Sequence, residues 1–185
     1  MKKILFIACL IWATSSVAQS SHFTGFSLSL DYADNGFDDT STPGGHSYSQ
    51  NGVPSVTAQY YLPVNERFVA GPYASYDLAS TDTSHIQGAA NHPFETGIKV
   101  GYAVSDQLLA YLKLGYSFSQ FVQPSGYDSW MHGPSYGIGA DYLVTEHIFG
   151  RVEVSQQNYN TLRWSDGSSD KCIISSYGVA IGYLF

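Results

Sequence analysis

The C-terminal stretch 173–185 alternates between two kinds of side chain. Counting back from the end, every second residue is large and apolar: Phe185, Tyr183, Ile181, Val179 and Tyr177. The residues between them are mostly small: Gly182, Ala180, Gly178 and Ser176. Alternation with a period of two is the pattern of a β-strand whose two faces differ. This strand must therefore separate a region that accepts bulky apolar side chains from one that leaves almost no room for side chains.

The same alternation recurs along the chain and predicts eight strands, at 23–32, 53–62, 67–79, 94–104, 108–119, 133–144, 148–159 and 173–185. Long connections (35–51, 80–93, 120–132 and 160–172) alternate with short ones (63–66, 105–107 and 145–147). Outer-membrane barrels have this asymmetry, with short periplasmic turns and long outer loops. We therefore predict an all-β fold, an eight-stranded antiparallel transmembrane up-and-down β-barrel. Pro72 interrupts the third strand and predicts a bulge there, because proline cannot donate to a ladder.

The composition also favours a membrane barrel. Charged residues make up 12% of the chain, about half the usual ~25% of a soluble domain. No stretch after the N-terminus approaches the ~20 apolar residues that a membrane helix needs, so strands must do the spanning. The acidic balance, with 15 Asp and Glu against 8 Lys and Arg, argues against a nucleic-acid partner.

The first residues predict export. Lys2 and Lys3 precede a short apolar run, and Ser16-Val17-Ala18 has the small residues of a cleavage site. We predict a signal peptide at 1–18 and a mature barrel domain at 19–185, exported through the inner membrane to the cell outer membrane. Removing Lys2 and Lys3 leaves six basic residues against 15 acidic ones, a net charge of 6 − 15 = −9. Cys172 is then the remaining cysteine, so no internal disulfide is expected.

Charges inside the predicted strands all fall on the face of small residues: Asp31, Asp77, Glu95, Lys99, Lys113, Asp141, Arg151 and Glu153. A Lys or Arg facing the middle of the bilayer costs about 2–4 kcal/mol, so this face should line the lumen. An eight-stranded interior is only wide enough to be filled by side chains, and charges buried there need partners. We predict an ion-pair network that plugs the lumen, made of Glu95, Lys99, Lys113, Asp141, Arg151 and Glu153.

Aromatic residues cluster at both ends of the predicted strands, as expected for girdles at the two bilayer interfaces. Phe149 is out of phase with the outward face of its strand, which predicts a place in the turn or a bulge. Other aromatics fall in the predicted outer loops and are candidates for contact with a partner: Phe37, Tyr48, Tyr127, Trp130 and Trp164.

The segments 95–102 (ETGIKVGY), 111–116 (YLKLGY) and 137–142 (GIGADY), with Arg151-Val152-Glu153, resemble strand motifs of small eight-stranded outer-membrane proteins. This is the opacity-type and porin-like family, similar to the transmembrane domain of OmpA-type proteins. Val154 departs from the family, which often has Tyr after the Glu. The resemblance covers the whole mature chain. It implies that Tyr177, Val179, Ile181, Tyr183 and Phe185 form the signal read by the outer-membrane assembly machinery.

The resemblance also implies a monomeric structural or surface-interaction protein, acting in adhesion, host contact or envelope integrity through its outer loops. The expected partners are outer-membrane lipid, lipopolysaccharide and host surface molecules. A small-solute or ion channel is one alternative. A lipid A-modifying barrel enzyme is another, since His132 and Ser135 lie close in sequence, but that family's His-x-Ser motif is missing. We therefore predict no enzyme activity.

Two further classes are disfavoured. A soluble lipocalin-like barrel would carry an N-terminal Gly-x-Trp, whereas this chain has Gly25-Phe26-Ser27 and little charge for a soluble surface. The histidines His46, His85, His92 and His132 form no close ligand pair, so no metal and no cofactor are expected.

Overall fold

A computed structural model describes the backbone of residues 20–39, 47–83, 88–122, 128–163 and 169–185. It describes side chains for residues 20–36, 52–80, 92–120, 122, 128–159 and 173–185. The predicted signal peptide at 1–18 lies outside the described residues. No helix among the described residues is long and apolar enough to cross a membrane.

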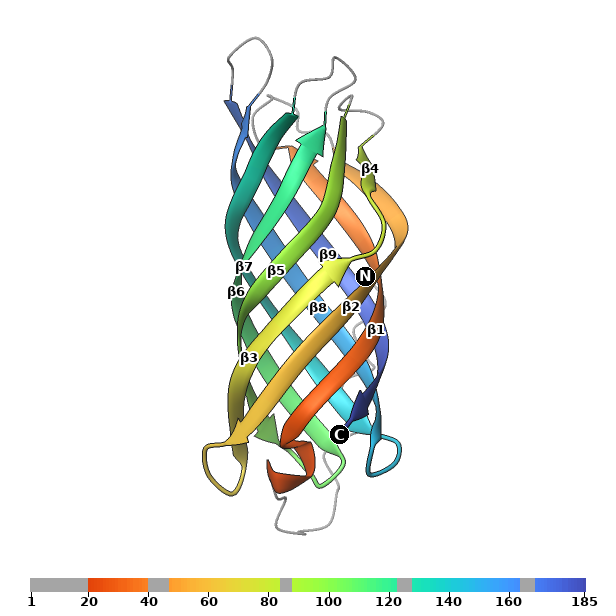
Figure 1. Ribbon diagram of the computed structural model, residues 1–185, viewed down its shortest axis with the longest axis vertical. Coiled ribbons are helices and arrows are strands. Elements are labelled where there is room, and N and C mark those ends of the chain that lie inside the picture. The colour runs from red at the N-terminus through yellow and green to blue at the C-terminus, as the bar shows by residue number, and fades with distance from the viewer. Residues whose placement is uncertain (1–19, 40–46, 84–87, 123–127, 164–168) are drawn as a thin grey trace, which may run out of the picture.

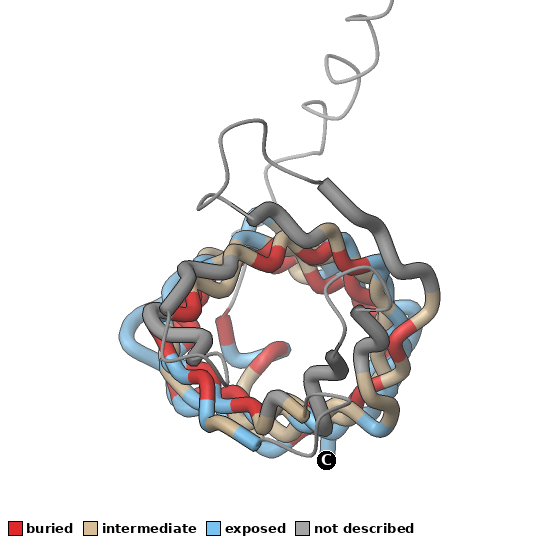
Figure 2. Tube along the Cα trace, turned by 90° about the horizontal axis from the view of Figure 1, so that it is seen from above, coloured by how far each residue is buried: buried red, intermediate tan, exposed pale blue. Residues whose placement is uncertain are grey.

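The chain forms a closed antiparallel β-barrel (Figure 1). Its elements are η1 (Ser20–Phe23), β1 (Gly25–Asp39), β2 (Ser47–Pro63), β3 (Phe68–Asp77), β4 (Thr81–Thr83), β5 (Gly88–Ala103), β6 (Leu108–Val122), β7 (Asp128–Leu143), β8 (Ile148–Arg163) and β9 (Ser169–Leu184). Neighbours in the chain pair from β1 to β3 and from β4 to β9. In addition, β1 pairs with β9, and β3 pairs with β5 to close the ring seen in Figure 2. The short β4 also pairs with β5, beyond the end of β3. It therefore extends the place that β3 occupies in the barrel wall. The predicted eight-stranded barrel is therefore confirmed.

The three short turns share the same pattern of hydrogen bonds from backbone N–H groups to a side-chain oxygen. The Asn65 Oδ1 atom accepts bonds from the backbone N–H groups of residues 67 and 68. The Ser105 and Thr145 hydroxyl oxygens occupy the same place in the other two turns. Side chains of this kind stabilise tight turns by bonding the backbone two residues on. The three turns gather at the lower end of the barrel in Figure 1.

The strands continue further towards the long connections than the sequence predicted. β1 runs to Asp39 rather than residue 32, and β7 begins at Asp128 rather than 133. The predicted bounds followed the apolar alternation, which ends where the lipid ends. Ladder hydrogen bonds need no apolar side chains, so the polar segments still pair. Bulges at Ala33/Asn35, Asn91/Phe94 and Tyr159/Leu162 mark this outer part of the wall.

Two predicted details are wrong. The first strand does not begin at Phe23, because that residue lies in η1 and is buried inside the barrel mouth. Pro72 causes no bulge, because the pairing of β2 with β3 keeps one register on both sides of it, from Gln59↔Tyr73 to Leu62↔Ala70. The proline lies on the outer, exposed face.

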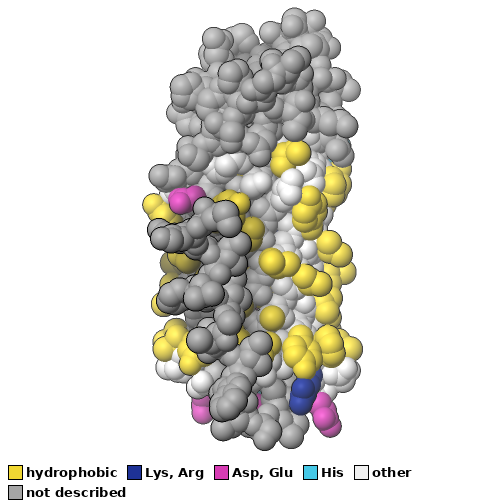
Figure 3. Space-filling model, turned by 180° about the vertical axis from the view of Figure 1, so that it is seen from behind, with side chains coloured by type: hydrophobic (Ala, Val, Ile, Leu, Met, Phe, Trp, Pro, Cys, Tyr) yellow, Lys and Arg dark blue, Asp and Glu magenta, His cyan; other side chains and the backbone are white. Residues whose placement is uncertain are grey.

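The outer face carries the bulky apolar side chains, and many of them are exposed, including Leu114 (69%) and Ile181 (62%). Figure 3 shows rows of hydrophobic side chains on this face, with charged groups at the edges of the band. Exposed aromatics flank the band near the short turns (Tyr60, Phe68, Tyr142, Tyr183) and towards the long connections (Tyr32, Tyr76, Phe94, Phe118, Tyr136, Tyr177). This surface suits a bilayer with aromatic residues at both interfaces.

Candidate functional site in the lumen

Every charged residue predicted to face the lumen has an inward position. Glu95, Lys99, Lys113, Asp141 and Arg151 are at most 7% exposed. Asp31, Asp77 and Glu153 are partly buried. Because each strand alternates between its faces, one register places the charges inside and the bulky apolar residues outside. The lumen therefore has a charged interior surrounded by an apolar wall.

Arg151 and Asp141 form a bidentate ion pair in the interior. They are direct cross-strand partners on β7 and β8. The Arg151 Nε and Nη2 atoms lie 2.7 and 2.9 Å from the two carboxylate oxygens of Asp141. The same Nη2 atom donates to Gln59 Oε1 at 2.8 Å, and Arg151 Nη1 lies 3.8 Å from Asp31 Oδ1. This bidentate pair ties β8 to β7 and reaches across the lumen to β1 and β2.

Glu153 is the centre of a second group. Its carboxylate lies 2.5 Å from Lys113 Nζ and 3.3 Å from Lys99 Nζ, and it accepts a 2.6 Å bond from the Tyr111 hydroxyl. Lys113 Nζ also lies 3.2 Å from Glu95 Oε1. The structure thus brings together all six residues of the predicted network, which we call the ionic layer: Glu95, Lys99, Lys113, Asp141, Arg151 and Glu153.

Aromatic rings enclose the ionic layer, and the sequence prediction did not include them. Lys99 Nζ lies 4.5 Å from the ring centre of Tyr111 and 5.2 Å from that of Tyr73. The Tyr73 hydroxyl donates to Glu95, and Gln59 accepts from Lys99 Nζ at 3.2 Å. The rings and the amide satisfy and shield the charges. The sequence does mark Tyr73 and Tyr111 as unusual, because both are large residues on the strand face that otherwise carries small ones.

Below the ionic layer, at the short-turn end, lies a second set of buried side chains that we call the apolar layer: Phe23, Tyr61, Val69, Ala103, Leu109, Leu143, Phe149 and Leu184. Phe149 is 4% exposed and points inward, so its predicted place in the turn or at a bulge is wrong. Its ring centre lies 5.2 Å from the Arg151 guanidinium carbon, which joins the two layers. In the sequence, the apolar layer is marked by apolar residues at consecutive positions next to the turns, as in Tyr102-Ala103-Val104 and Tyr142-Leu143-Val144.

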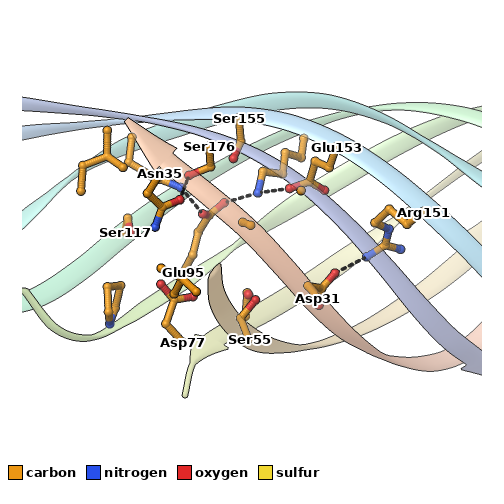
Figure 4. A pocket seen from close by; sticks show the side chains of 18 of the residues that line it. Asp31, Asn35, Ser55, Asp77, Glu95, Ser117, Arg151, Glu153, Ser155 and Ser176 are labelled. Carbon is orange, nitrogen blue, oxygen red and sulfur yellow. Dashed lines mark hydrogen bonds and ion pairs between the residues drawn. The ribbon is translucent and has the colours of Figure 1, made fainter. Parts of the chain in front are cut away.

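Above the ionic layer the lumen contains a cavity of about 80 Å³. Figure 4 shows Asp31, Asp77, Glu95 and several serines around it, with Arg151 and Glu153 at its side. No residue of the apolar layer lines it. Among the described residues, no three His, Cys, Asp or Glu side chains form a group that could hold a metal ion. The cavity is a polar recess that ends at the ionic layer.

The pair proposed for the enzyme alternative is divided between the two faces of β7. His132 is exposed on the outer face, where its Nδ1 atom lies 2.7 Å from the Tyr116 hydroxyl. Ser135 is 2% exposed and faces the lumen. A histidine can activate a serine only within hydrogen-bond reach, so these two residues do not form a nucleophile and base.

The loop aromatics are only partly within the described structure. Tyr127 and Trp164 lie outside the described residues, and for Phe37 and Tyr48 only the backbone pairing Phe37↔Tyr48 is described. Trp130 lies in β7 and not in a connecting loop, so its predicted location is wrong. Its side chain is 69% exposed on the outer face, near the end of β7 that leads to the long connection.

The five residues of the predicted assembly signal lie on the outer face of the C-terminal strand. Tyr177, Val179, Ile181 and Tyr183 are all at least 44% exposed, and Phe185 follows β9 at 66%. The Phe185 ring packs 5.6 Å from that of Phe26 across the seam where β9 meets β1. Their recognition by an assembly machinery stays a prediction.

The sequence matches the family described as outer membrane protein beta-barrel domain over residues 5–185. The chain belongs to this family. It is an outer-membrane β-barrel protein, as the resemblance in its strand motifs predicted, whereas assignment to the opacity type stays a prediction. No curated protein matches the sequence.

Solved structures share the fold at low sequence identity. The barrel is similar to Neisserial surface protein A (NspA), with a TM-score of 0.62, 14% identity and coverage of 88% of this chain and 98% of that one. It is also similar to Ail, the attachment invasion locus protein of Yersinia pestis, with a TM-score of 0.56, 12% identity and coverage of 88% and 99%. Ail has a second structure in complex with the heparin analogue sucrose octasulfate, with a TM-score of 0.52, 13% identity and coverage of 88% and 99%. At these identities the likeness establishes the fold of the barrel alone.

Proposed function

We propose that this outer-membrane barrel is closed to solutes and acts at the cell surface, through the residues at its long-connection end. The observation that carries this proposal is the ionic layer, whose ion pairs span the lumen from β5 to β8 and reach β1 and β2 through Arg151. A lumen filled in this way offers no continuous water path, so the barrel serves as a membrane anchor for what it displays outside. We propose that this role is attachment or host contact, the surface role that the family resemblance implies. A filled lumen disfavours the channel alternative.

The names of the similar structures point in the same direction, since one is an attachment invasion locus protein and the other a surface protein. The ligand, however, should differ from the heparin analogue found with Ail. This chain has 15 acidic and 8 basic residues, and such a charge disfavours a polyanion. We propose a neutral or basic host surface molecule as the partner.

The test is an adherence assay with a non-adherent Gram-negative strain that displays the full chain. Trp130→Ala is expected to reduce attachment to host cells, because aromatic residues exposed at an interface carry much of its binding energy. Tyr142→Ala is the matched control, since Tyr142 is also an exposed aromatic on β7 but lies at the short-turn end. Added heparin is expected to have no effect. Attachment no better than that of the empty strain, at equal surface levels of the barrel, would contradict the proposal.

A further inference from the structure

The chain closes its own short-turn mouth with a segment that belongs to no strand. The 3₁₀-helix η1 precedes β1 and forms the red coil at the lower mouth of the barrel in Figure 1. Phe23, its last residue, is 4% exposed and belongs to the apolar layer. The other seven members of this layer lie on barrel strands. Phe23 is therefore brought into the lumen from below and is not part of the wall.

The attachment of η1 is local. The Ser20 N–H donates to Glu66 O at 2.7 Å, and the Ser20 hydroxyl donates to Asn65 O at 2.6 Å. Both acceptors lie in the turn between β2 and β3. Thr24 bonds back to Ser21 O, so it holds the helix together without tying it to the wall. By contrast, Val69 and Ala103 are fixed by backbone pairing in their strands.

A glycine forms the joint between η1 and the wall. Gly25 has φ of +118°, a backbone conformation that residues with a Cβ rarely adopt. A Cβ there would also lie 3.1 Å from the carbonyl oxygen of Phe185. The joint allows the chain to leave β1 at the rim and turn back into the mouth. A short 3₁₀ segment outside the strand ladder is the kind of element that opens locally at low free energy.

The two closures of the lumen face different compartments. The cavity above the ionic layer is lined by Glu95, Lys113 and Arg151 and by no member of the apolar layer. The apolar layer lies between the ionic layer and the short turns, which face the periplasm in barrels of this type. Removing η1 would therefore expose the apolar layer and leave the cavity above the ionic layer as it is.

We propose that Ser20–Phe23 is a releasable stopper that closes the periplasmic mouth of the lumen. Phe23 completes the apolar layer, and this layer excludes water and ions because a narrow hydrophobic constriction does not stay wet. The bonds of Ser20 hold the stopper in place, and Gly25 is the joint on which it moves. The ionic layer is then protected from the periplasm by a movable part of the same chain.

Thiol labelling tests this proposal. The reporter is Ala103→Cys, since Ala103 is 0% exposed in the apolar layer, in full-length protein with Cys9→Ser and Cys172→Ser. The reagent is a small trimethylammonium methanethiosulfonate, applied to the refolded barrel in lipid vesicles made permeable to it. Phe23→Ala is expected to raise the labelling rate about tenfold, the scale of a local opening made easier by one lost packing contact. His22→Ala is the matched control, because His22 is exposed in the same helix, and it should leave the rate unchanged.

A second reporter separates the stopper from a general loosening of the barrel. Ser75→Cys lines the cavity on the other side of the ionic layer, and its labelling should not respond to Phe23→Ala. Phe23→Leu should give an intermediate rate at the Ala103→Cys reporter, which keeps the test decisive if the alanine variant folds poorly. Folding is checked by gel electrophoresis of unheated samples, in which each variant should keep the mobility of the folded wild-type barrel. Equal rates at Ala103→Cys with and without Phe23, or equal acceleration at both reporters, would overturn the proposal.

Discussion

The ionic layer and the apolar layer fill the same lumen, but they are stabilised by different interactions. In the ionic layer, charges are withdrawn from water at a large cost, and their attraction offsets that cost only where every group has a partner. Arg151 and Glu153 satisfy this condition through two or more partners each. In the apolar layer, burial itself stabilises, at about 25 cal/mol per Å² of surface removed from water. The first layer therefore specifies geometry across the barrel, and the second excludes water.

The two layers should also fail differently. Removing one member of an ion pair leaves an unpaired charge, whereas truncating an apolar side chain leaves a cavity. The first defect can be repaired by removing the partner charge, and the second only by restoring volume.

Arg151→Ala is expected to cause the largest loss, about 3–5 kcal/mol in the free energy of unfolding, because Asp141 stays buried without its counter-charge. Urea titration of the refolded barrel in lipid vesicles, followed by tryptophan fluorescence, measures the change. The double variant Asp141→Leu/Arg151→Met should recover most of the loss, since the buried carboxylate of Asp141 is removed together with its counter-charge. A double variant as unstable as Arg151→Ala would show that the pair itself, and not the unpaired charge, determines stability.

Leu109→Ala is expected to cost roughly 2–5 kcal/mol, because Leu109 is fully buried in the apolar layer and its truncation leaves a cavity. The matched control on the same strand is Leu112→Ala, whose side chain is 60% exposed on the outer face. Lipid can fill the space left there, so the loss should be clearly smaller. The same urea titration compares the two variants, and equal losses would contradict a buried layer at Leu109.

Gly182→Ala is expected to have the smallest effect, about 1–3 kcal/mol, the usual cost of overpacking a filled core. A Cβ at Gly182 would collide with the tip of the Phe149 ring. Phe149→Leu in the same chain should relieve this collision and recover part of the stability. Additive losses in the double variant would show that the two positions do not touch.

Much of the fold could be predicted because the bilayer imposes a strict rule on each strand. Charged residues cannot face lipid cheaply, so Glu95 and Lys99, or Arg151 and Glu153, fix which face of their strand points inward. Apolar residues carry no such information, because a leucine or phenylalanine is acceptable on either face. For this reason the alternation shows that Phe149 is out of phase but does not place it in the lumen, and it does not identify Leu109 and Leu143 as members of a buried layer.

The contacts between distant segments could not be predicted in this way. Phe23 lies in phase with the small residues Ser27 and Ser29, so alternation does not explain the position of its ring. The positive φ of Gly25 and the bonds of Ser20 show that the chain turns into the mouth. Gln59 on β2 and Tyr73 on β3 reach the ionic layer from strands outside β5–β8, and their roles depend on the stagger of strands that alternation alone does not give. Alternation does not predict the polar ends of β1 and β7, because pairing beyond the bilayer leaves no apolar pattern.

Single-channel conductance of the refolded wild-type protein in planar lipid bilayers shows whether the lumen is closed. With both layers intact, we expect no current steps above the baseline of the protein-free membrane. Steady, ion-selective conductance of the wild-type barrel would contradict a closed lumen and favour the channel alternative over the surface role.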